Sequence, residues 1–185
     1  MKPGAGKRKG SSFERDICRY ISNWLSNGQR DDLLWRSPNS GGKATVNKSS
    51  QYSGDICLAY PEFGAKEFMD LFSVECKAYK DLDLFKYDNP ELSIWKWWYQ
   101  AEEDAKRVGK VPILIFKINR QGTFVAVNGW EFVDYALKQK KINYFHSYNY
   151  PVSMVLSNSR RDCIIVMKID EFFNEVLDKG QIIKE

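Results

Sequence analysis

Apolar residues recur three or four positions apart in two long stretches of the chain. The first stretch runs from residue 13 to about residue 26, and the second runs from residue 91 to residue 108. This spacing places the apolar side chains on one side of a helix. Asn27-Gly28 after the first stretch and Gly109 after the second are typical helix ends. The pattern therefore predicts two long amphipathic helices.

Shorter runs, either continuously apolar or alternating, predict strands. Val111–Ile118 is nearly continuous in apolar residues, which is typical of a buried central strand. The strands predicted in this way cover residues 33–36, 55–59, 68–77, 111–118, 123–127, 152–156 and 163–169, with short helices at 130–137 and 170–178. The turn at 61–64 suggests that 55–59 and 68–77 form a hairpin. The predicted fold class is α/β, a central mixed β-sheet flanked by helices.

Length and composition indicate one globular domain. The chain has 185 residues, of which 43% are hydrophobic and 15% aromatic. Residues 1–10 contain Lys2, Lys7, Arg8 and Lys9 and no acidic residue, so we predict a flexible basic arm there and a single domain over residues 11–185. No apolar run is long enough to span a bilayer, and we expect no membrane partner.

The cysteines do not form a metal-binding pattern. The four of them are far apart, no C-x-x-C pair occurs, and His146 is the single histidine. We therefore expect no zinc site, and reduced, buried thiols of a cytoplasmic protein.

The candidate chemistry centres on Glu75 and Lys77. Side chains alternate along a strand, so these two share one face, and Asp55 precedes them by 20 residues. The E-x-K spacing alone is weak evidence, since it also suits an ordinary solvated strand. Two carboxylates and an amine can nevertheless bind Mg²⁺ and a phosphate, because Mg²⁺ needs only one or two protein carboxylates. The hypothesis is metal-dependent hydrolysis of a phosphodiester.

Other groups could complete such a site. Cys76 could add its main-chain carbonyl as a metal ligand, Glu14 could act through a water molecule, and Gln100 could hydrogen-bond into the site. Glu14 has an equally simple alternative, because Ser11 and Glu14 form an S-x-x-E capping box.

Two further segments bear on the partner. Residues 37–54 contain Lys43 and Lys48 and no acid, which suits a nucleic-acid backbone, although an ordinary surface loop remains an alternative. The tryptophans and tyrosine at 95–99 favour a core or subunit contact over a base-stacking platform.

Five short motifs in order resemble one nuclease superfamily. They are Lys7-Arg8-Lys9-Gly10-Ser11 leading to Glu14-Arg15, then Arg36-Ser37-Pro38-Asn39-Ser40-Gly41, Asp55, Glu75-Cys76-Lys77, and Gln100 before Lys106-Arg107-Val108-Gly109. Together they resemble the PD-(D/E)xK nucleases, and most closely the archaeal-type Holliday-junction resolvases. The resemblance covers about residues 7–118. Gly54 replaces the family's proline, two connecting segments are longer, and nothing after about residue 120 matches.

The resemblance implies a restriction-endonuclease-like fold and a homodimeric, Mg²⁺-dependent endonuclease, with Mn²⁺ as a possible substitute, that cuts branched DNA, above all four-way junctions. It favours Glu14 as an active-site carboxylate and makes Ser40 a candidate for positioning the cleaved strand. The residues expected to contact DNA are Lys7, Arg8, Lys9, Arg15, Arg36, Lys43 and Lys48.

Three alternatives remain open from the sequence. The first is a repair or restriction-like nuclease of the same superfamily that acts on linear or single-stranded DNA. The second is a DNA-binding module without catalysis. The third is a structural protein in which the E-x-K spacing is a coincidence.

Overall fold

The computed structural model describes residues 5–38, 54–79, 93–129, 154–177 and 179–182, with only the backbone described at 5–9, 93 and 181. The elements in chain order are α1 (Ala5–Ser26), β1 (Leu34–Arg36), β2 (Ile56–Leu58), α2 (Ala65–Leu71), β3 (Phe72–Tyr79), α3 (Ser93–Val108), β4 (Val111–Ile118), β5 (Gly122–Asn128), β6 (Met154–Ser157), β7 (Cys163–Lys168), α6 (Ile169–Glu171), the π-helix η3 (Phe172–Val176) and α7 (Lys179–Ile182). Among the described residues, no helix is long and apolar enough to cross a membrane.

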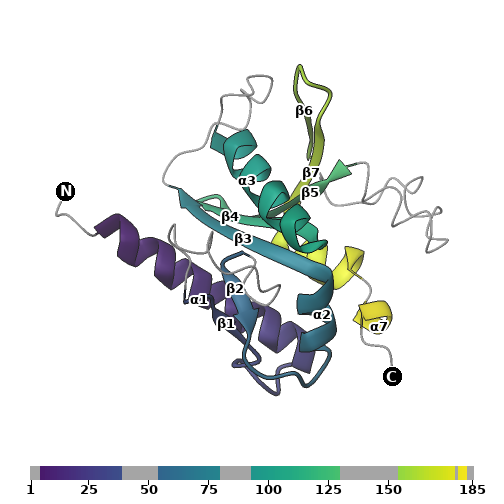
Figure 1. Cartoon of the computed structure of the whole chain (residues 1–185). Helices are drawn as coiled ribbons and strands as arrows, with labels where there is room; N and C mark the ends of the chain where they lie inside the picture. The colour runs from purple at the N-terminus through teal and green to yellow at the C-terminus, as the bar shows by residue number, and fades with distance from the viewer. Residues whose placement is uncertain (1–4, 39–53, 80–92, 130–153, 178, 183–185) are drawn as a thin grey trace.

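A mixed sheet of five strands forms the centre of the molecule, in the order β3-β4-β5-β7-β6 (Figure 1). β3 runs parallel to β4, and the other pairs are antiparallel. β3 therefore lies at one edge of this sheet, where its outer N–H and C=O groups have no ladder partner in the sheet. Glu75 of β3 lies beside Leu114 of β4, and Lys77 lies beside Phe116.

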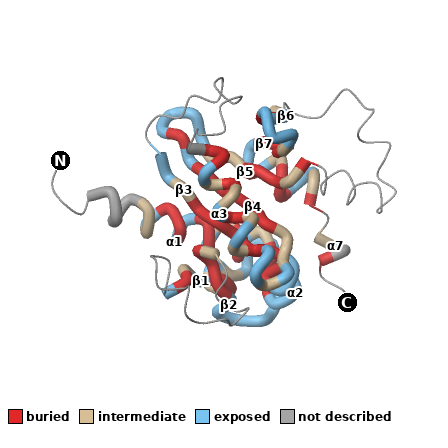
Figure 2. The backbone as a smooth tube through the Cα atoms, turned by 45° about the horizontal axis from the view of Figure 1, so that its top comes forward, coloured by how far each residue is buried: buried red, intermediate tan, exposed pale blue. Residues whose placement is uncertain are grey.

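Helices cover both faces of this sheet. Val74 and Cys76 face α1, the small hairpin β1–β2 and the C-terminal helices. Leu114 and Phe116 face α3 on the opposite side. Figure 1 shows α1 and the hairpin below the sheet and α3 above it, and Figure 2 shows the central strands as the buried part of the fold. The predicted α/β class with a mixed, helix-flanked sheet is confirmed.

The tryptophan-rich start of α3 belongs to the core, as favoured by the sequence. Trp95 and Trp98 are fully buried against β4 and β7, while Trp97 and Tyr99 pack at the margin of the same cluster. The predicted strands 111–118, 123–127 and 163–169 also match observed strands within one or two residues.

The predicted hairpin between 55–59 and 68–77 is wrong. β2 pairs antiparallel with β1 instead, and residues 65–71 form α2. The segment AKEFMDL consists mostly of strong helix formers, and it places Phe68 and Met69 in the core. The only direct pairing between this region and β3 among the described residues is a parallel bridge between Gly54 and Val74.

α1 begins at Ala5, so residues 5–10, predicted as part of a flexible basic arm, continue the first helix. Alanine, lysine and arginine are good helix formers, and they outweigh the two glycines of this segment. Ser11 consequently lies inside the helix, so it cannot be the N-cap of a capping box with Glu14. Residues 1–4 lie outside the described residues.

The C-terminal helix predicted at 170–178 is divided. It begins as α6, widens into the π-helix η3, and is followed by α7, which contains Gly180. Tyr20 of α1 donates a hydrogen bond of 2.7 Å to Asp170, and its ring packs edge-on against Phe173. The predicted helix at 130–137, the basic patch at 138–141 and the aromatic segment at 144–150 lie outside the described residues.

Gly54 allows the chain to approach the edge of β3. Its φ is +80°, and a Cβ built on it would lie 2.4 Å from the carbonyl oxygen of Val74. Real Cβ atoms essentially never come this close to another heavy atom, so a side chain would displace residue 55 from β3. Glycine at this position is therefore a steric requirement of the bridge.

We expect Gly54→Ala to lower the free energy of unfolding by about 3 kcal/mol, because strain at positive φ adds to a backbone clash. Gly28→Ala is the matched control, since Gly28 also has a φ of +80° but no atom within 4 Å of its Cβ position. It should cost about 1 kcal/mol. Urea unfolding measures both, and equal losses would contradict the steric argument.

Candidate active site

Asp55 is fixed against the open edge of β3 by two hydrogen bonds. Its backbone N–H donates to the Val74 carbonyl at 2.8 Å, and its Oδ2 accepts from the Cys76 N–H at 2.9 Å. Its carbonyl in turn accepts from the Ser37 N–H at 2.8 Å, which ties it to the end of β1. The carboxylate is only 9% exposed. Groups that an edge strand leaves unpaired thus position the first predicted acid.

Glu75 lies on the α3 side of the same strand and contacts two predicted partners. Lys77 Nζ is 2.5 Å from Glu75 Oε1, and Gln100 Nε2 of α3 donates to that oxygen at 2.9 Å. Glu75 is 4% exposed, so it is a buried acid that shares one oxygen between an ammonium and an amide. The structure brings Asp55, Glu75, Lys77 and Gln100 together, as the sequence predicted.

Glu14 reaches the site from the opposite layer. It is 9% exposed on α1, and its Oε2 accepts a hydrogen bond from Arg36 Nε of β1. The negative charge of Glu14 acts on Asp55, as described below, so the two carboxylates are close. The side chain therefore faces the site and does not cap the helix.

Burial and like charges raise the pKa values of both central acids. Burial, followed by the charge of Glu14, raises the pKa of Asp55 to about 6, against the lowering effect of its hydrogen bond from Cys76. Burial, followed by the charge of Asp55, raises the pKa of Glu75 to about 7, against the lowering effect of Lys77. The nearby cations therefore compensate the negative charge only in part.

The Cys76 carbonyl is directed toward the same edge. In an extended strand the N–H and C=O of one residue point to the same side, and the Cys76 N–H points to Asp55. The carbonyl therefore faces away from β4 and toward the side where Asp55 lies. This supports its predicted place in the ligand set.

These oxygen donors fit a hard divalent cation. Two buried carboxylates with raised pKa values and an outward-facing carbonyl suit Mg²⁺, which completes its shell with water and substrate oxygens. No cluster of three or more His, Cys, Asp or Glu side chains suited to a metal occurs in the described part of the chain. Mg²⁺ does not need one, because one or two carboxylates suffice.

Several predicted residues lie elsewhere. Ser40, Lys43 and Lys48 fall outside the described residues. Lys7, Arg8 and Lys9 lie in the first turns of α1, where the side chains are not described. Arg15 is exposed on α1, one residue after Glu14.

The structure also reveals contributors that the sequence interpretation missed. Arg36 was expected to contact DNA, and the structure adds an ion pair with Glu14 that the sequence interpretation did not include. Asp104 adds a negative charge that acts on Glu75, and its position one turn after Gln100 on α3 could have indicated this. The buried hydroxyl of Ser37 has no hydrogen-bond partner among the described residues, and no sequence signal marks it.

The comparisons with known proteins agree with this geometry. Residues 5–184 match the family described as "Phage putative PDDEXK endonuclease". The chain belongs to this PDDEXK endonuclease family. The PDDEXK chain is also 31% identical to "Protein D14" of Escherichia phage T5 over 126 residues, which are 66% of this chain and 68% of that protein. No solved structure matches it.

Membership confirms the predicted superfamily and its restriction-endonuclease-like α/β fold. The protein is therefore a nuclease, and nucleases of this superfamily generally use divalent metals such as Mg²⁺. The closer resemblance to archaeal-type junction resolvases stays a prediction.

The raised pKa values predict how stability depends on pH in the metal-free PDDEXK protein. The ordinary pKa values are 3.8 for Asp55 and 4.5 for Glu75, so between about pH 4 and pH 7 the folded state holds more protons than the unfolded state. The free energy of unfolding should therefore fall as the pH rises through this window, by at most about 1.4 kcal/mol per unit of pKa shift. Thermal unfolding in EDTA should give a lower Tm at pH 8 than at pH 5.5.

Glu75→Gln should flatten this dependence, because it removes one of the two acids and the repulsion between them. Glu103→Gln is the matched control, because the Glu103 side chain is 69% exposed. This substitution should leave the pH dependence of stability as it is in the wild type. A Glu75→Gln profile as steep as that of the wild type would contradict the assignment.

Proposed function

We propose that the protein is a Mg²⁺-dependent DNA endonuclease that cuts branched DNA, above all four-way junctions. The observation that carries the catalytic part is the cluster at the open edge of β3. There the buried carboxylates of Asp55 and Glu75 lie close enough for charge to couple them, and Lys77 contacts Glu75 at 2.5 Å. A structural role alone would give no reason to bury two repelling acids beside a lysine.

Asp55, Glu75 and the Cys76 carbonyl would hold the cation. When bound, it would supply positive charge to the phosphate and lower the pKa of water in the site. The hydrogen bond from the Cys76 N–H keeps the Asp55 carboxylate oriented toward the strand edge. Mn²⁺, which also accepts oxygen ligands, is a possible substitute.

Lys77 and Gln100 both contact Glu75, and Lys77 would also act on the phosphate or on the water molecule. Lys77 carries a compact positive charge that suits a phosphate oxygen or a water molecule that loses its proton. Gln100 holds the Glu75 oxygen from α3 and so keeps the carboxylate from rotating. Both act on Glu75, so its orientation is fixed from its own strand and from the neighbouring helix.

Glu14 and Arg36 form the other wall of the site. Their ion pair joins α1 to β1, and the Ser37 N–H holds the carbonyl of Asp55. Arg36 thus limits the negative charge around Asp55 while Glu14 remains available for a water-mediated contact with the cation. Arg15 is exposed at the next position of α1, and we expect it to contact the DNA backbone.

The choice of branched DNA rests on the ordered motifs shared with the junction resolvases. A resolvase must cut two strands, and a homodimer with twofold symmetry would present two equivalent sites to a four-way junction. The buried, unpaired thiols of Cys18, Cys57 and Cys76 suit a reducing compartment, and we propose the cytoplasm.

The catalytic assignment predicts that Glu75→Ala and Lys77→Ala each lower the rate of DNA cleavage in Mg²⁺ by at least about a hundredfold. Cleavage of a labelled synthetic four-way junction, resolved on a denaturing gel, measures this. Glu103→Ala and Lys66→Ala are the matched controls, because both residues are exposed and form only surface ion pairs. Undiminished cleavage by the first two variants would rule out the assigned site.

The substrate assignment predicts that the wild-type protein cuts a four-way junction at least about tenfold faster than a linear duplex of the same sequence, a difference of about 1.4 kcal/mol. The measurement is competition between the two DNAs, with different labels, in one reaction. Equal rates would favour the linear-DNA nuclease, and binding without cleavage in any divalent metal would favour the DNA-binding module.

A further inference from the structure

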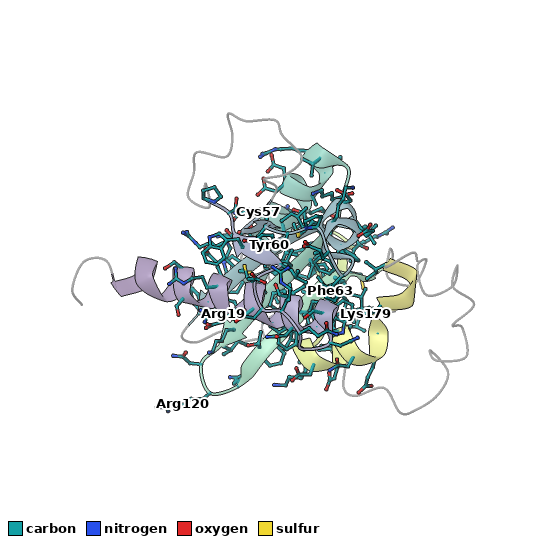
Figure 3. The ribbon with its side chains drawn as sticks, turned by 90° about the horizontal axis from the view of Figure 1, so that it is seen from below. Arg19, Cys57, Tyr60, Phe63, Arg120 and Lys179 are labelled. Carbon is teal, nitrogen blue, oxygen red and sulfur yellow. The ribbon has the colours of Figure 1, made fainter. Side chains whose placement is uncertain are left out.

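A recess of about 130 Å³ lies beside the active site, between α1 and β1. It is lined by residues of α1, of β1 and of the segment before β1: Arg15, Cys18, Arg19, Asp31, Asp32, Leu34, Trp35 and Arg36. Figure 3 looks at the molecule from below and labels Arg19 on α1, together with Cys57 on the neighbouring hairpin. None of the site chemistry above uses Arg19 or Trp35.

Trp35 points outward from β1, whereas its two neighbours in the strand point inward. It is 58% exposed, whereas Leu34 is fully buried and Arg36 turns toward Glu14. Alternation along β1 accounts for the direction of the side chain, but it does not require a tryptophan. Trp35 lines the recess with its ring exposed, and an exposed aromatic ring can stack on a base.

The ring of Trp35 lacks the cover that the exposed rings of Tyr60 and Tyr79 have. Arg30 lies 4.6 Å above the ring of Tyr60, and Tyr79 packs against Trp97 at 5.2 Å between ring centroids. Among the described residues, no aromatic ring and no cation covers Trp35 in this way. Its π face is open to a partner.

The charges around the recess favour a phosphate. Arg15 and Arg19 are one helical turn apart on the exposed side of α1, and neither forms an ion pair with another described residue. Asp32 is neutralised by Arg30 through two hydrogen bonds of 2.7 and 2.9 Å. Asp31 is exposed and leaves one negative charge beside the two positive charges of Arg15 and Arg19.

The size of the recess limits the ligand. Pockets for enclosed small molecules are about 300 Å³ or more, so this one is too small to enclose a cofactor. It can accept a phosphate or the face of one base laid over the indole. Stacking on an indole needs a base that is free of its own neighbours, which branched or single-stranded DNA provides.

We propose that this recess binds one unpaired nucleotide of the DNA substrate, with its base stacked on Trp35 and its phosphate held by Arg15 and Arg19. The proposal deepens the proposed function and rests on it, because the recess adjoins the active site through Arg36 and Glu14. Trp35 would distinguish an unpaired base near the cut from continuous duplex. It is a specificity residue and takes no part in hydrolysis.

The test is DNA binding in EDTA, which separates this site from cleavage. Fluorescence anisotropy compares a labelled duplex carrying one bulged nucleotide with the fully paired duplex, and a single strand forms a third arm. Wild-type protein should bind the bulged duplex and the single strand more tightly than the paired duplex. Trp35→Leu should weaken binding of both by about tenfold and leave the paired duplex unchanged.

Three further variants test the aromatic ring, the position of the ring and the phosphate contact separately. Trp35→Phe keeps a ring and should retain most of the preference. Phe63→Leu is the matched control, since Phe63 is an exposed ring on the turn before α2, and Figure 3 shows it away from Arg19. It should behave as the wild type. Arg19→Gln should weaken binding of the bulged duplex and of the single strand, and it should reduce the salt dependence of that binding by about one phosphate contact.

Wild-type affinity for both Trp35 variants, or an equal loss on bulged and paired duplex, would overturn the proposal. Thermal unfolding checks that each variant is folded. Because Trp35 is exposed, we expect its replacement to leave the fold intact. Because no cleavage is needed, loss of the preference in Trp35→Leu would support the recess even if the variants of Glu75 showed the proposed catalysis to be wrong.

Discussion

The site depends on how residues 54 and 55 attach to the open edge of β3. An edge strand leaves N–H and C=O groups unpaired, and these groups must find a partner or remain solvated. Here the Val74 carbonyl and the Cys76 N–H are used by Asp55, one through its backbone and one through its carboxylate. The contact is possible only because Gly54 has no side chain. The same contact therefore satisfies the edge of β3 and orients the Asp55 carboxylate.

This edge is also where the two helical layers meet. Side chains of a strand alternate between faces, so Glu75 and Lys77 face α3 while Val74 and Cys76 face α1. Gln100 can therefore reach Glu75 from one layer, and Glu14 can approach Asp55 from the other. Acids drawn from α1, β3 and the segment before β2 converge although they are 20 or more residues apart in sequence. A site on the middle strands could not draw on both layers.

The electrostatic arrangement is unfavourable for the metal-free protein and suited to cation binding. Burial and mutual repulsion raise the pKa values of Asp55 and Glu75, and Lys77 offsets only part of this. A divalent cation held by Asp55 and Glu75 would offset this repulsion with its positive charge. The Glu14–Arg36 pair limits the excess negative charge, and it also connects the acids to the arginine-lined recess that contains Trp35. The groups that we propose for catalysis and for DNA recognition would therefore share one wall.

The sequence by itself determined the parts that local pattern encodes. The apolar repeat predicted most of α1 and α3, the continuous run of Val111–Ile118 predicted β4, and the ordered motifs predicted Asp55, Glu75, Lys77 and Gln100 as neighbours. It assigned residues 68–71 to a strand although they belong to α2, because a short amphipathic segment suits a helix or a strand until its packing is known. Only the tertiary structure decided that Asp55 joins β3 through a parallel bridge, that Glu14 faces the site, and that Trp35 stays exposed. These depend on contacts between residues distant in the chain, which local periodicity does not record.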